Sequence, residues 1–216
     1  TIWGLSWKED TTLDRLNRLG YGNTWRLDLK EDLDITEELS NVETVQERLT
    51  LEQSRKIVEK RGKADIVIAR HLIEHAFDLQ EFINAVKSLV NPDGYVVFEI
   101  PDCQNSMDNL DYTTVWEEHT IYFTPQTFKA CFAFNGLKLV DFIEEEYLLE
   151  NSYIGIATMK GQTGETQLSA LTVQQEIERA NRFASSLESK RQDLQKYLTD
   201  FRGERNKVAI FGAAHM

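Results

Sequence analysis

The chain has 216 residues, of which 41% are hydrophobic and 10% aromatic, enough to build the core of one sizeable domain. Its 24 basic and 36 acidic residues give a formal net charge of -12, which argues against a general nucleic-acid binder, because clustered Lys and Arg hold a phosphate backbone. Cys103 and Cys131 are too few for a disulfide framework or a four-cysteine zinc site. No apolar run reaches the roughly 18 residues of a membrane span, and no signal-peptide pattern is present, so we expect a cytoplasmic protein.

Two short strands with a helix between them are expected at the start of the chain. Thr1–Leu5 is an apolar run typical of a strand, and Asn23–Leu27 is a second, weaker one. The helix between them would be capped at Asp10 or Thr11 and would end near Gly20, because short polar side chains favour a helix start and glycine favours its end.

A strand–helix–strand unit is expected in the middle of the chain. Residues 29–41 are acidic and poorly periodic, which predicts a loop, and Thr50 with Gln53 then forms a capping-box pattern. The pattern beyond it predicts a helix over Leu51–Lys60, a buried strand over Ala64–Ala69, a helix over Asp78–Val90, a turn at Asn91–Gly94 and a strand over Tyr95–Ile100. Such a unit favours a right-handed crossover and parallel pairing.

An antiparallel pair is expected to complete the sheet. After a loop over Pro101–Asp111, the pattern predicts a helix from Thr124-Pro125 to about Phe134 and strands over Leu137–Glu144 and Ser152–Met159. The short connection between these two strands suits antiparallel neighbours. The predicted fold is therefore an α/β domain with an open, mostly parallel Rossmann-like sheet that ends in an antiparallel pair.

We expect three parts along the chain. Residues 1–160 would form the α/β domain, and residues 161–206 a turn-rich linker followed by a long amphipathic helix. Residues 207–216 would be a strand and glycine turn that begin a truncated C-terminal domain, so we expect a segment of a longer protein. The near-heptad spacing of apolar residues on the long helix would suit packing on its own chain or contact between copies in a homo-oligomer.

Chemistry is expected beyond the carboxyl ends of the strands, where open α/β sheets bind their ligands. Those positions are Ser6–Asp10, Asp28, Arg70–His75, Pro101–Asn105 and the segment around His119. Asp28 could accept the hydroxyl hydrogen bonds of an adenosine ribose, or it could be an ordinary loop acid. The segment Ser6–Asp10 contains no glycine, which disfavours a phosphate-cradling loop.

Three histidines, in two segments of the chain, could take part in chemistry. His71 and His75 lie one helical turn apart, yet they lack the glutamate of a zinc-protease motif, so we expect no metal there and favour a cleft-lining or structural role. His119 stands in a polar and aromatic cluster, where neighbouring carboxylates could make it a general base near neutral pH. The alternative is a loop whose aromatic residues pin it to the sheet.

These segments together resemble a known family. The order ADIVIARHLIEHAFDL, NPDGYVVFEIPD and WEEHTIYFTPQTF resembles the class I methyltransferases that depend on S-adenosyl-L-methionine (SAM), and more narrowly the sugar C-methyltransferases that act on nucleotide-linked keto-deoxysugars. The residues that carry the match are Ala69–His75, Glu118-His119, Tyr122-Phe123 and Thr124.

The resemblance implies SAM as the cofactor and a small-molecule acceptor, a nucleotide sugar in the narrower reading. It implies that His119 removes a proton next to the sugar ketone, supported by Glu118 and His75, and that the enolate attacks the methyl group of SAM. The cofactor would be held by Ser6, Asp10, Asp28, Arg70 and His71.

Two alternatives stay open. The glycine-free turn and Trp116 favour a catalytically silent methyltransferase-like domain used for binding or assembly. His119 could also deprotonate a hydroxyl group, which would make the chain a small-molecule O-methyltransferase.

Overall fold

A six-stranded sheet organises the computed structural model, which describes residues 1–36, 42–116, 118–147, 151–161, 168–203 and 207–209. The strands are β1 (Ile2–Gly4), β2 (Thr24–Arg26), β3 (Ala64–Arg70), β4 (Val90–Pro101), β5 (Lys138–Glu145) and β6 (Ser152–Thr158). Their order in the sheet is β2-β1-β3-β4-β6-β5. The first four run parallel, and β6 lies antiparallel to both β4 and β5. The predicted fold class is confirmed.

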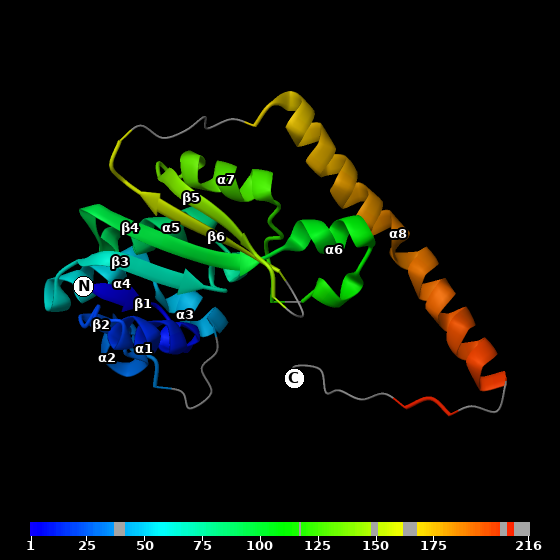
Figure 1. The fold of residues 1–216 in the computed structure, drawn as a ribbon, viewed down its shortest axis with the longest axis horizontal. Coiled ribbons are helices and arrows are strands. Elements are labelled where there is room, and N and C mark those ends of the chain that lie inside the picture. The colour runs from blue at the N-terminus through cyan, green and yellow to red at the C-terminus, as the bar shows by residue number, and fades with distance from the viewer. Residues whose placement is uncertain (37–41, 117, 148–150, 162–167, 204–206, 210–216) are drawn as a thin grey trace.

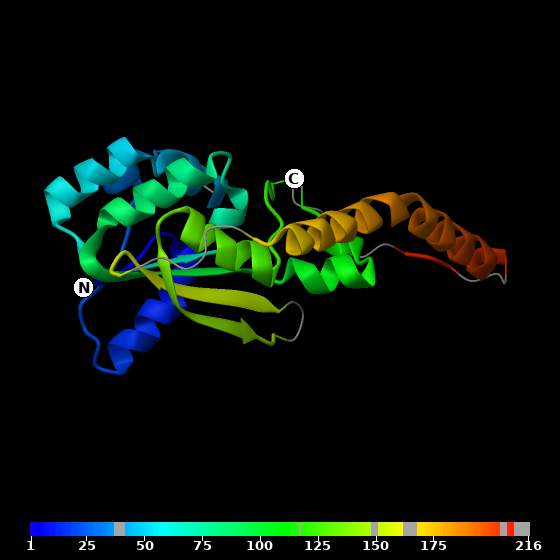
Figure 2. The same ribbon diagram turned by 90° about the horizontal axis from the view of Figure 1, so that it is seen from above.

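Helices cover both faces of the sheet. In chain order they are α1 (Asp10–Arg18), α2 (Leu29–Leu33), α3 (Val42–Arg48), α4 (Leu51–Arg61), α5 (Leu79–Leu89), α6 (Cys103–Asn109), α7 (Pro125–Phe134) and α8 (Ala170–Gly203), with 3-10 turns at Trp7–Glu9, Ile73–His75 and Tyr112–Thr114. Figure 2 shows α4 and α5 on one face of the sheet and α1 on the other. Lys87 on α5 donates to the carbonyl of Asn135 just after α7, at 2.7 Å, so these two helices are neighbours.

The core lies where α4, α5 and α7 meet the central strands. Val67 on β3 and Phe98 on β4 are almost fully buried, as the continuous apolar runs of these strands require. Phe98 meets Phe132 of α7 with ring centroids 5.9 Å apart. Burial of large apolar side chains on both faces of β3 and β4 fixes these strands in the centre of the sheet.

Three expectations were wrong in detail. Leu29–Leu33 is a helix rather than part of a loop, because Asp28 caps it through its side chain. Cys103–Asn109 is likewise a helix, capped by Asp102, inside the expected loop Pro101–Asp111.

The expected turn at Asn91–Gly94 is extended and forms the start of β4. Glycine is required there, because a Cβ at Gly94 would lie 2.5 Å from the carbonyl oxygen of Asp65 on the neighbouring strand. The strand therefore passes too close to its neighbour for a side chain at this position.

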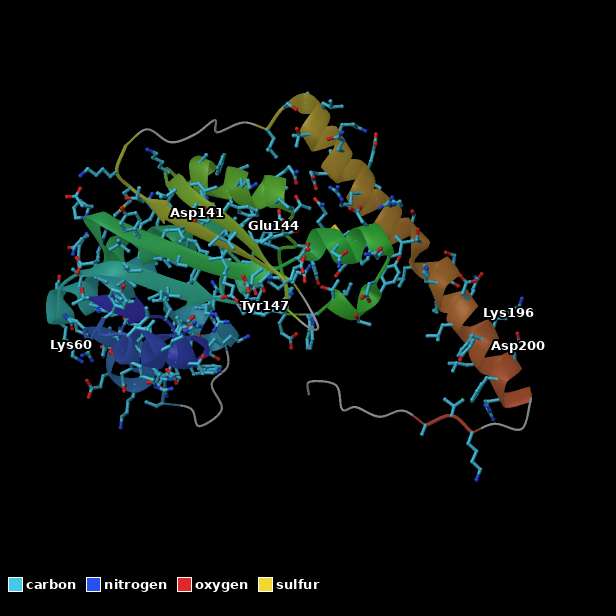
Figure 3. The ribbon with its side chains drawn as sticks, in the orientation of Figure 1. Lys60, Asp141, Glu144, Tyr147, Lys196 and Asp200 are labelled. Atoms are coloured by element: carbon cyan, nitrogen blue, oxygen red, sulfur yellow. The ribbon has the colours of Figure 1, made fainter. Side chains whose placement is uncertain are left out.

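Helix α8 differs from all the others in its surroundings. Its first half rests on the segment around α6, where Tyr112 stacks on Phe183 and both Arg179 and Arg182 bind Asp108. Its second half extends beyond the sheet, and Figure 3 shows Lys196 and Asp200 on this outer part. No residue of α8 is buried. The expected contact between copies through this helix stays a prediction.

The C-terminal boundary is described only in part. Residues Lys207–Ala209 of the expected last strand form no regular element, and the rest of that segment, 210–216, lies outside the described residues, as does most of the linker, 162–167. The division into 1–160, 161–206 and 207–216 remains a prediction. Among the helices that the structure describes, none combines the length and the apolar character needed to cross a bilayer.

Candidate functional site

The carboxyl ends of β1, β2 and β3 meet at one edge of the sheet, which faces α6 (Figure 1). Leu5 donates to the carbonyl of Ile68 at 3.2 Å, and Leu27 donates to the carbonyl of Gly4 at 3.0 Å. The segments beginning at Ser6, Asp28 and Arg70 therefore leave the sheet side by side, as the rule for parallel sheets predicts.

Glu9 joins the ends of β1 and β3. One carboxylate oxygen accepts from the backbone and the hydroxyl of Ser6, at 2.6 and 2.9 Å, and the other accepts from the backbone of Arg70 at 2.7 Å. Glu9 is fully buried, and burial raises its pKa despite these hydrogen bonds. Sequence reasoning missed this residue, although the spacing of Ser6 and Glu9 is a capping-box signal.

An ion-pair cluster closes the ends of β3 and β4. Arg70 and Glu99 are direct neighbours in the register of the two strands, and the guanidinium binds the carboxylate through two nitrogens at 2.6 and 3.1 Å. A third nitrogen of Arg70 donates to the carbonyl of Lys8 at 2.9 Å. Burial alone would raise the pKa of Glu99, but His71 and Arg70 outweigh it and lower that pKa to about 2.

His71 lies between two carboxylates. Its Nδ1 is 3.3 Å from Glu74 Oε1, and its Nε2 is 3.7 Å from Glu99 Oε1. Burial lowers the pKa of His71, but the two carboxylates together raise it to about 9, so the ring is an imidazolium at neutral pH. Its backbone is in the left-handed region, with a φ of 51°, which is strained for a residue other than glycine.

Asp10 and Asp28 stand on the β1–β2 side of the edge. Asp10 pairs with Arg26 at 3.0 Å, and both side chains are exposed. One oxygen of Asp28 accepts from the backbones of Lys30 and Glu31, and these bonds, chiefly that of Glu31, lower its pKa. Asp28 is thus an exposed carboxylate held in place as a helix cap.

A second cluster brings together Glu74, His75 and His119. One oxygen or nitrogen of each lies within 4.8 Å of the others, and the two imidazole rings meet edge to face with centroids 4.7 Å apart. Glu74 and His75 are buried, and His119 is half-buried. A carboxylate and two imidazoles at this spacing are also within reach of one divalent cation, and the expectation that no metal binds stays a prediction.

Hydrogen bonds strap the loop that carries His119 onto the turn after β3. Thr120 donates to the carbonyl of Glu74 through its backbone and its hydroxyl, and that hydroxyl also lies 2.9 Å from the carbonyl of Ala76. Nδ1 of His75 lies 3.2 Å from the backbone carbonyl of Glu118. The chain thus brings His119 to the turn that carries His75 and Glu74, and Glu118 contacts this turn through its main chain.

His119 is neutral and incompletely hydrogen-bonded. Burial lowers its pKa, and the negative charge of Glu74 only partly opposes that effect. Among the described residues, Nδ1 of His119 and Oε2 of Glu74 have no hydrogen-bond partner, although both atoms are buried. Such atoms are costly unless a ligand or a rearrangement satisfies them, so this corner is a candidate functional site.

Aromatic residues frame His119. The hydroxyl of Tyr122 bonds the backbone nitrogen and carbonyl of Trp116, at 3.2 and 3.1 Å. The ring centroids of Tyr122 and Trp116 lie 6.0 and 6.4 Å from that of His119. The hydroxyl of Tyr122 therefore ties the loop to itself around the half-buried imidazole of His119, and the expected alternative, in which aromatic residues pin this loop to the sheet, stays a prediction. Glu117 lies outside the described residues.

The sequence-predicted site residues fall into two groups, and Glu118 joins the larger one only through its backbone carbonyl, 3.2 Å from Nδ1 of His75. Ser6, Arg70 and His71 are joined through Glu9 and Glu99, and His71 continues through Glu74 to His75 and His119. Asp10 and Asp28 stand on the side of β2, where Asp10 pairs with Arg26 and Asp28 caps α2. Sequence reasoning missed Glu9, Glu74 and Glu99, the acids that connect the members of the larger group.

Several known proteins are similar to this chain. The C-methyltransferase NovU of Streptomyces niveus is 32% identical over 100 residues, which cover 46% of this chain and 24% of that relative, so the match spans about a quarter of its length. The solved structure of a SAM-dependent methyltransferase from Anabaena variabilis matches with 14% identity and a TM-score of 0.46, over 74% of this chain and 76% of that one. One from Clostridium acetobutylicum matches with 11% identity and a TM-score of 0.43, over 74% and 83%. The family model for the methyltransferase domain matches residues 11–141, more than half of the chain, which therefore belongs to the methyltransferase domain family.

Proposed function

We propose that this chain transfers the methyl group of SAM to a carbon atom of a small molecule, next to a ketone of a nucleotide-linked sugar, with His119 as the general base. The observation that carries the proposal is the half-buried imidazole of His119, whose pKa is lowered by burial and whose Nδ1 has no hydrogen-bond partner among the described residues. A base that must accept a proton near neutral pH has to keep a lone pair on one of its two ring nitrogens, while the other nitrogen can donate a hydrogen bond. The similarity to the C-methyltransferase NovU supports carbon as the methylated atom.

The chemistry of the residues at the carboxyl edge suits SAM. Asp28 is an exposed carboxylate two residues after β2, where it could accept hydrogen bonds from the two hydroxyl groups of a ribose. Gly4 ends β1 so close to Glu9 that a Cβ there would lie 2.7 Å from the Cβ of Glu9, so the turn after β1 packs tightly against the strand. The glycine-free segment after it suits a cofactor without phosphate groups. Ser6, Asp10, Arg70 and His71 would line the same pocket.

The proposed reaction is a proton abstraction followed by methyl transfer. His119 takes the proton from the carbon next to the ketone, so that a C–H bond breaks and an enolate forms. When bound, SAM would supply the electrophilic methyl group that the enolate carbon attacks. His75 supports the loop at the carbonyl of Glu118, which keeps the imidazole of His119 turned toward the cluster.

A non-catalytic methyltransferase-like domain is the second candidate, and one observation favours it. The carboxylate of Glu9 accepts hydrogen bonds from the backbone N–H groups of Ser6 and Arg70, and the side chain of Arg70 is paired with Glu99. Groups that were expected to hold the cofactor are therefore already bonded within the protein. O-methylation, in which His119 would deprotonate a hydroxyl, shares the same base.

Calorimetry and proton exchange separate these functions. We expect SAM to release binding heat with the wild-type chain and to lose affinity about tenfold in Asp28→Ala, because two charged hydrogen bonds disappear. Absence of binding heat would support the silent domain.

With a nucleotide-linked keto-deoxysugar in D2O, we expect exchange of the proton next to the ketone, and a loss of at least about 100-fold in His119→Gln. Unchanged exchange in that variant would remove His119 from the mechanism. Methyl transfer without any such exchange would point to a hydroxyl acceptor.

A further inference from the structure

Glu74 is a buried acid whose side chain lies close to His119. The resemblance, in contrast, implies Glu118 as the acid that supports His119. Glu74 is only 1% exposed and is held from three sides. His71 binds its Oε1, and the backbones of Thr120 and Ile121 both donate to its carbonyl, at 2.9 and 3.2 Å. The backbone of Glu74 and one of its carboxylate oxygens are therefore held, while the second oxygen, Oε2, is buried without a hydrogen-bond partner in the described structure.

The unsatisfied atoms of Glu74 and His119 are complementary. Oε2 of Glu74 can only accept a hydrogen bond, and Nδ1 of an imidazole donates one when it carries the proton. Both atoms are buried without a partner in the described structure, and the two side chains have polar atoms within 4.8 Å of each other. A rotation of the half-buried ring of His119 that brings Nδ1 within hydrogen-bond distance of Oε2 of Glu74 would give both atoms a partner.

We propose that Glu74 is the positioning residue of His119, and that its Oε2 accepts the Nδ1–H of His119 in the reacting state. The pairing selects the tautomer in which Nε2 carries the lone pair and faces the acceptor. The proton leaving the substrate carbon goes to Nε2, and the adjacent carboxylate of Glu74 stabilises the resulting imidazolium. This inference rests on the proposed role of His119 as the base.

The arrangement also gives His71 a function. His71 is a cation at neutral pH and binds Oε1 of Glu74, while Glu99 holds the other side of its ring. Contacts thus run from Glu99 on β4 through His71 to Glu74, and the proposed bond from Glu74 would orient the base, His119. The carboxylate of the neighbouring Glu118 is not needed for this, since its backbone carbonyl already serves His75.

Nitrogen-15 NMR tests the proposal without any substrate. The chain has four histidines, and single substitutions assign their ring signals. With SAM added and no acceptor present, we expect His119 as the Nδ1–H tautomer in the wild-type chain and a shift toward Nε2–H in Glu74→Gln, because an amide can also donate to Nδ1. An Nε2–H tautomer in the wild-type chain would overturn the proposal, whether or not His119 is a base.

Kinetics give the second arm. Glu74→Gln should lower kcat at least about 100-fold with little change in the Kd of SAM, whereas Glu74→Asp keeps the charge and should lose only about tenfold. Glu81→Gln, the same change at an exposed acid on α5, is the control. Thermal melting shows whether each variant is folded. A folded Glu74→Gln with unchanged kcat would contradict the proposal.

Metal analysis removes the competing explanation. The same three groups could share a divalent cation, so the purified wild-type chain is measured for bound metal before and after dialysis against a chelator. We expect no stoichiometric metal and no change in the His119 signals. One ion per chain, lost in Glu74→Gln, would replace the proton role of Glu74 with a ligand role and overturn the proposal.

Discussion

Two neighbouring clusters at the same sheet edge differ in how completely their polar groups are paired. In the first cluster, Glu99 binds Arg70 at 2.6 and 3.1 Å and lies 3.7 Å from His71, and Glu9 accepts from the backbone of Arg70. In the second cluster, Glu74 and His119 each keep a buried polar atom without a partner in the described structure. We therefore call Arg70, His71, Glu99 and Glu9 the scaffold cluster. The second cluster keeps polar atoms, free in the described structure, that a ligand or a proton could bind.

The difference follows from how each cluster is built. Arg70 and Glu99 are adjacent in the pairing of β3 and β4, so the backbone hydrogen bonds of the sheet determine their distance. His119 reaches Glu74 only through a loop, fastened by the bonds of Thr120. A loop can adjust by the fractions of an ångström that a reaction requires, whereas paired central strands cannot.

Breaking the scaffold cluster should have the largest effect on stability. Glu99→Gln leaves Arg70 and His71 as partly buried cations without their anion, and we expect a loss of about 3 to 4 kcal/mol in the free energy of unfolding at pH 7. Because the folded-state pKa of Glu99 is lowered to about 2, wild-type stability should fall as the pH drops from about 4.5 toward 2, and this component should be missing in the variant.

Urea unfolding measures both effects. Glu59→Gln, the same change at an exposed acid of α4, is the control and should stay within about 0.5 kcal/mol of wild type. A loss below about 1 kcal/mol in Glu99→Gln would mean that the ion pairs do not hold this end of the sheet.

The charge of His71 should make stability fall at alkaline pH. Its pKa is raised from 6.5 to about 9, so its contribution is fully present below about pH 6.5 and is lost as the pH rises through about 9. The shift corresponds to about 3 kcal/mol, since each pKa unit is about 1.4 kcal/mol. The charged groups that act on the ring are Glu74, Glu99 and Lys8.

Urea titrations from pH 6 to pH 10 follow this change. His71→Asn removes the titrating ring, so the alkaline loss should become flatter in the variant. An equally steep loss in His71→Asn would show that other groups cause it, and the scaffold cluster would then hold a neutral His71.

Loosening the second cluster should have the smallest effect on stability. Thr120→Val removes the hydroxyl that bonds the carbonyls of Glu74 and Ala76 but keeps the backbone bond, and we expect a loss of about 1 kcal/mol in urea unfolding. The rate of methyl transfer should fall by more than the small loss of folded protein explains, because the hydroxyl bonds of Thr120 hold the loop that carries His119. Thr199→Val on exposed α8 is the matched control. Full activity in Thr120→Val would show that the loop is positioned by its aromatic residues alone.

Part of the site was within reach of the sequence. The strand ends at Asp28, Arg70 and Pro101 were predictable, because apolar runs and turn residues determine where a buried strand stops. Glu9 could have been found from its capping-box spacing with Ser6. Glu74 could not have been found in this way, since nothing in the local pattern indicates that a loop 45 residues later packs against it.

Local patterns determined the central βαβ unit, the antiparallel pair and the carboxyl edge as the place for chemistry, because side-chain periodicity and turn residues act over a few positions. Only the tertiary structure decided that Glu99 pairs with Arg70 and His71, that Asp28 serves as the cap of α2, and that Glu74 meets His119. These contacts depend on strand register and on burial that removes competing water, and both arise only when distant segments pack together.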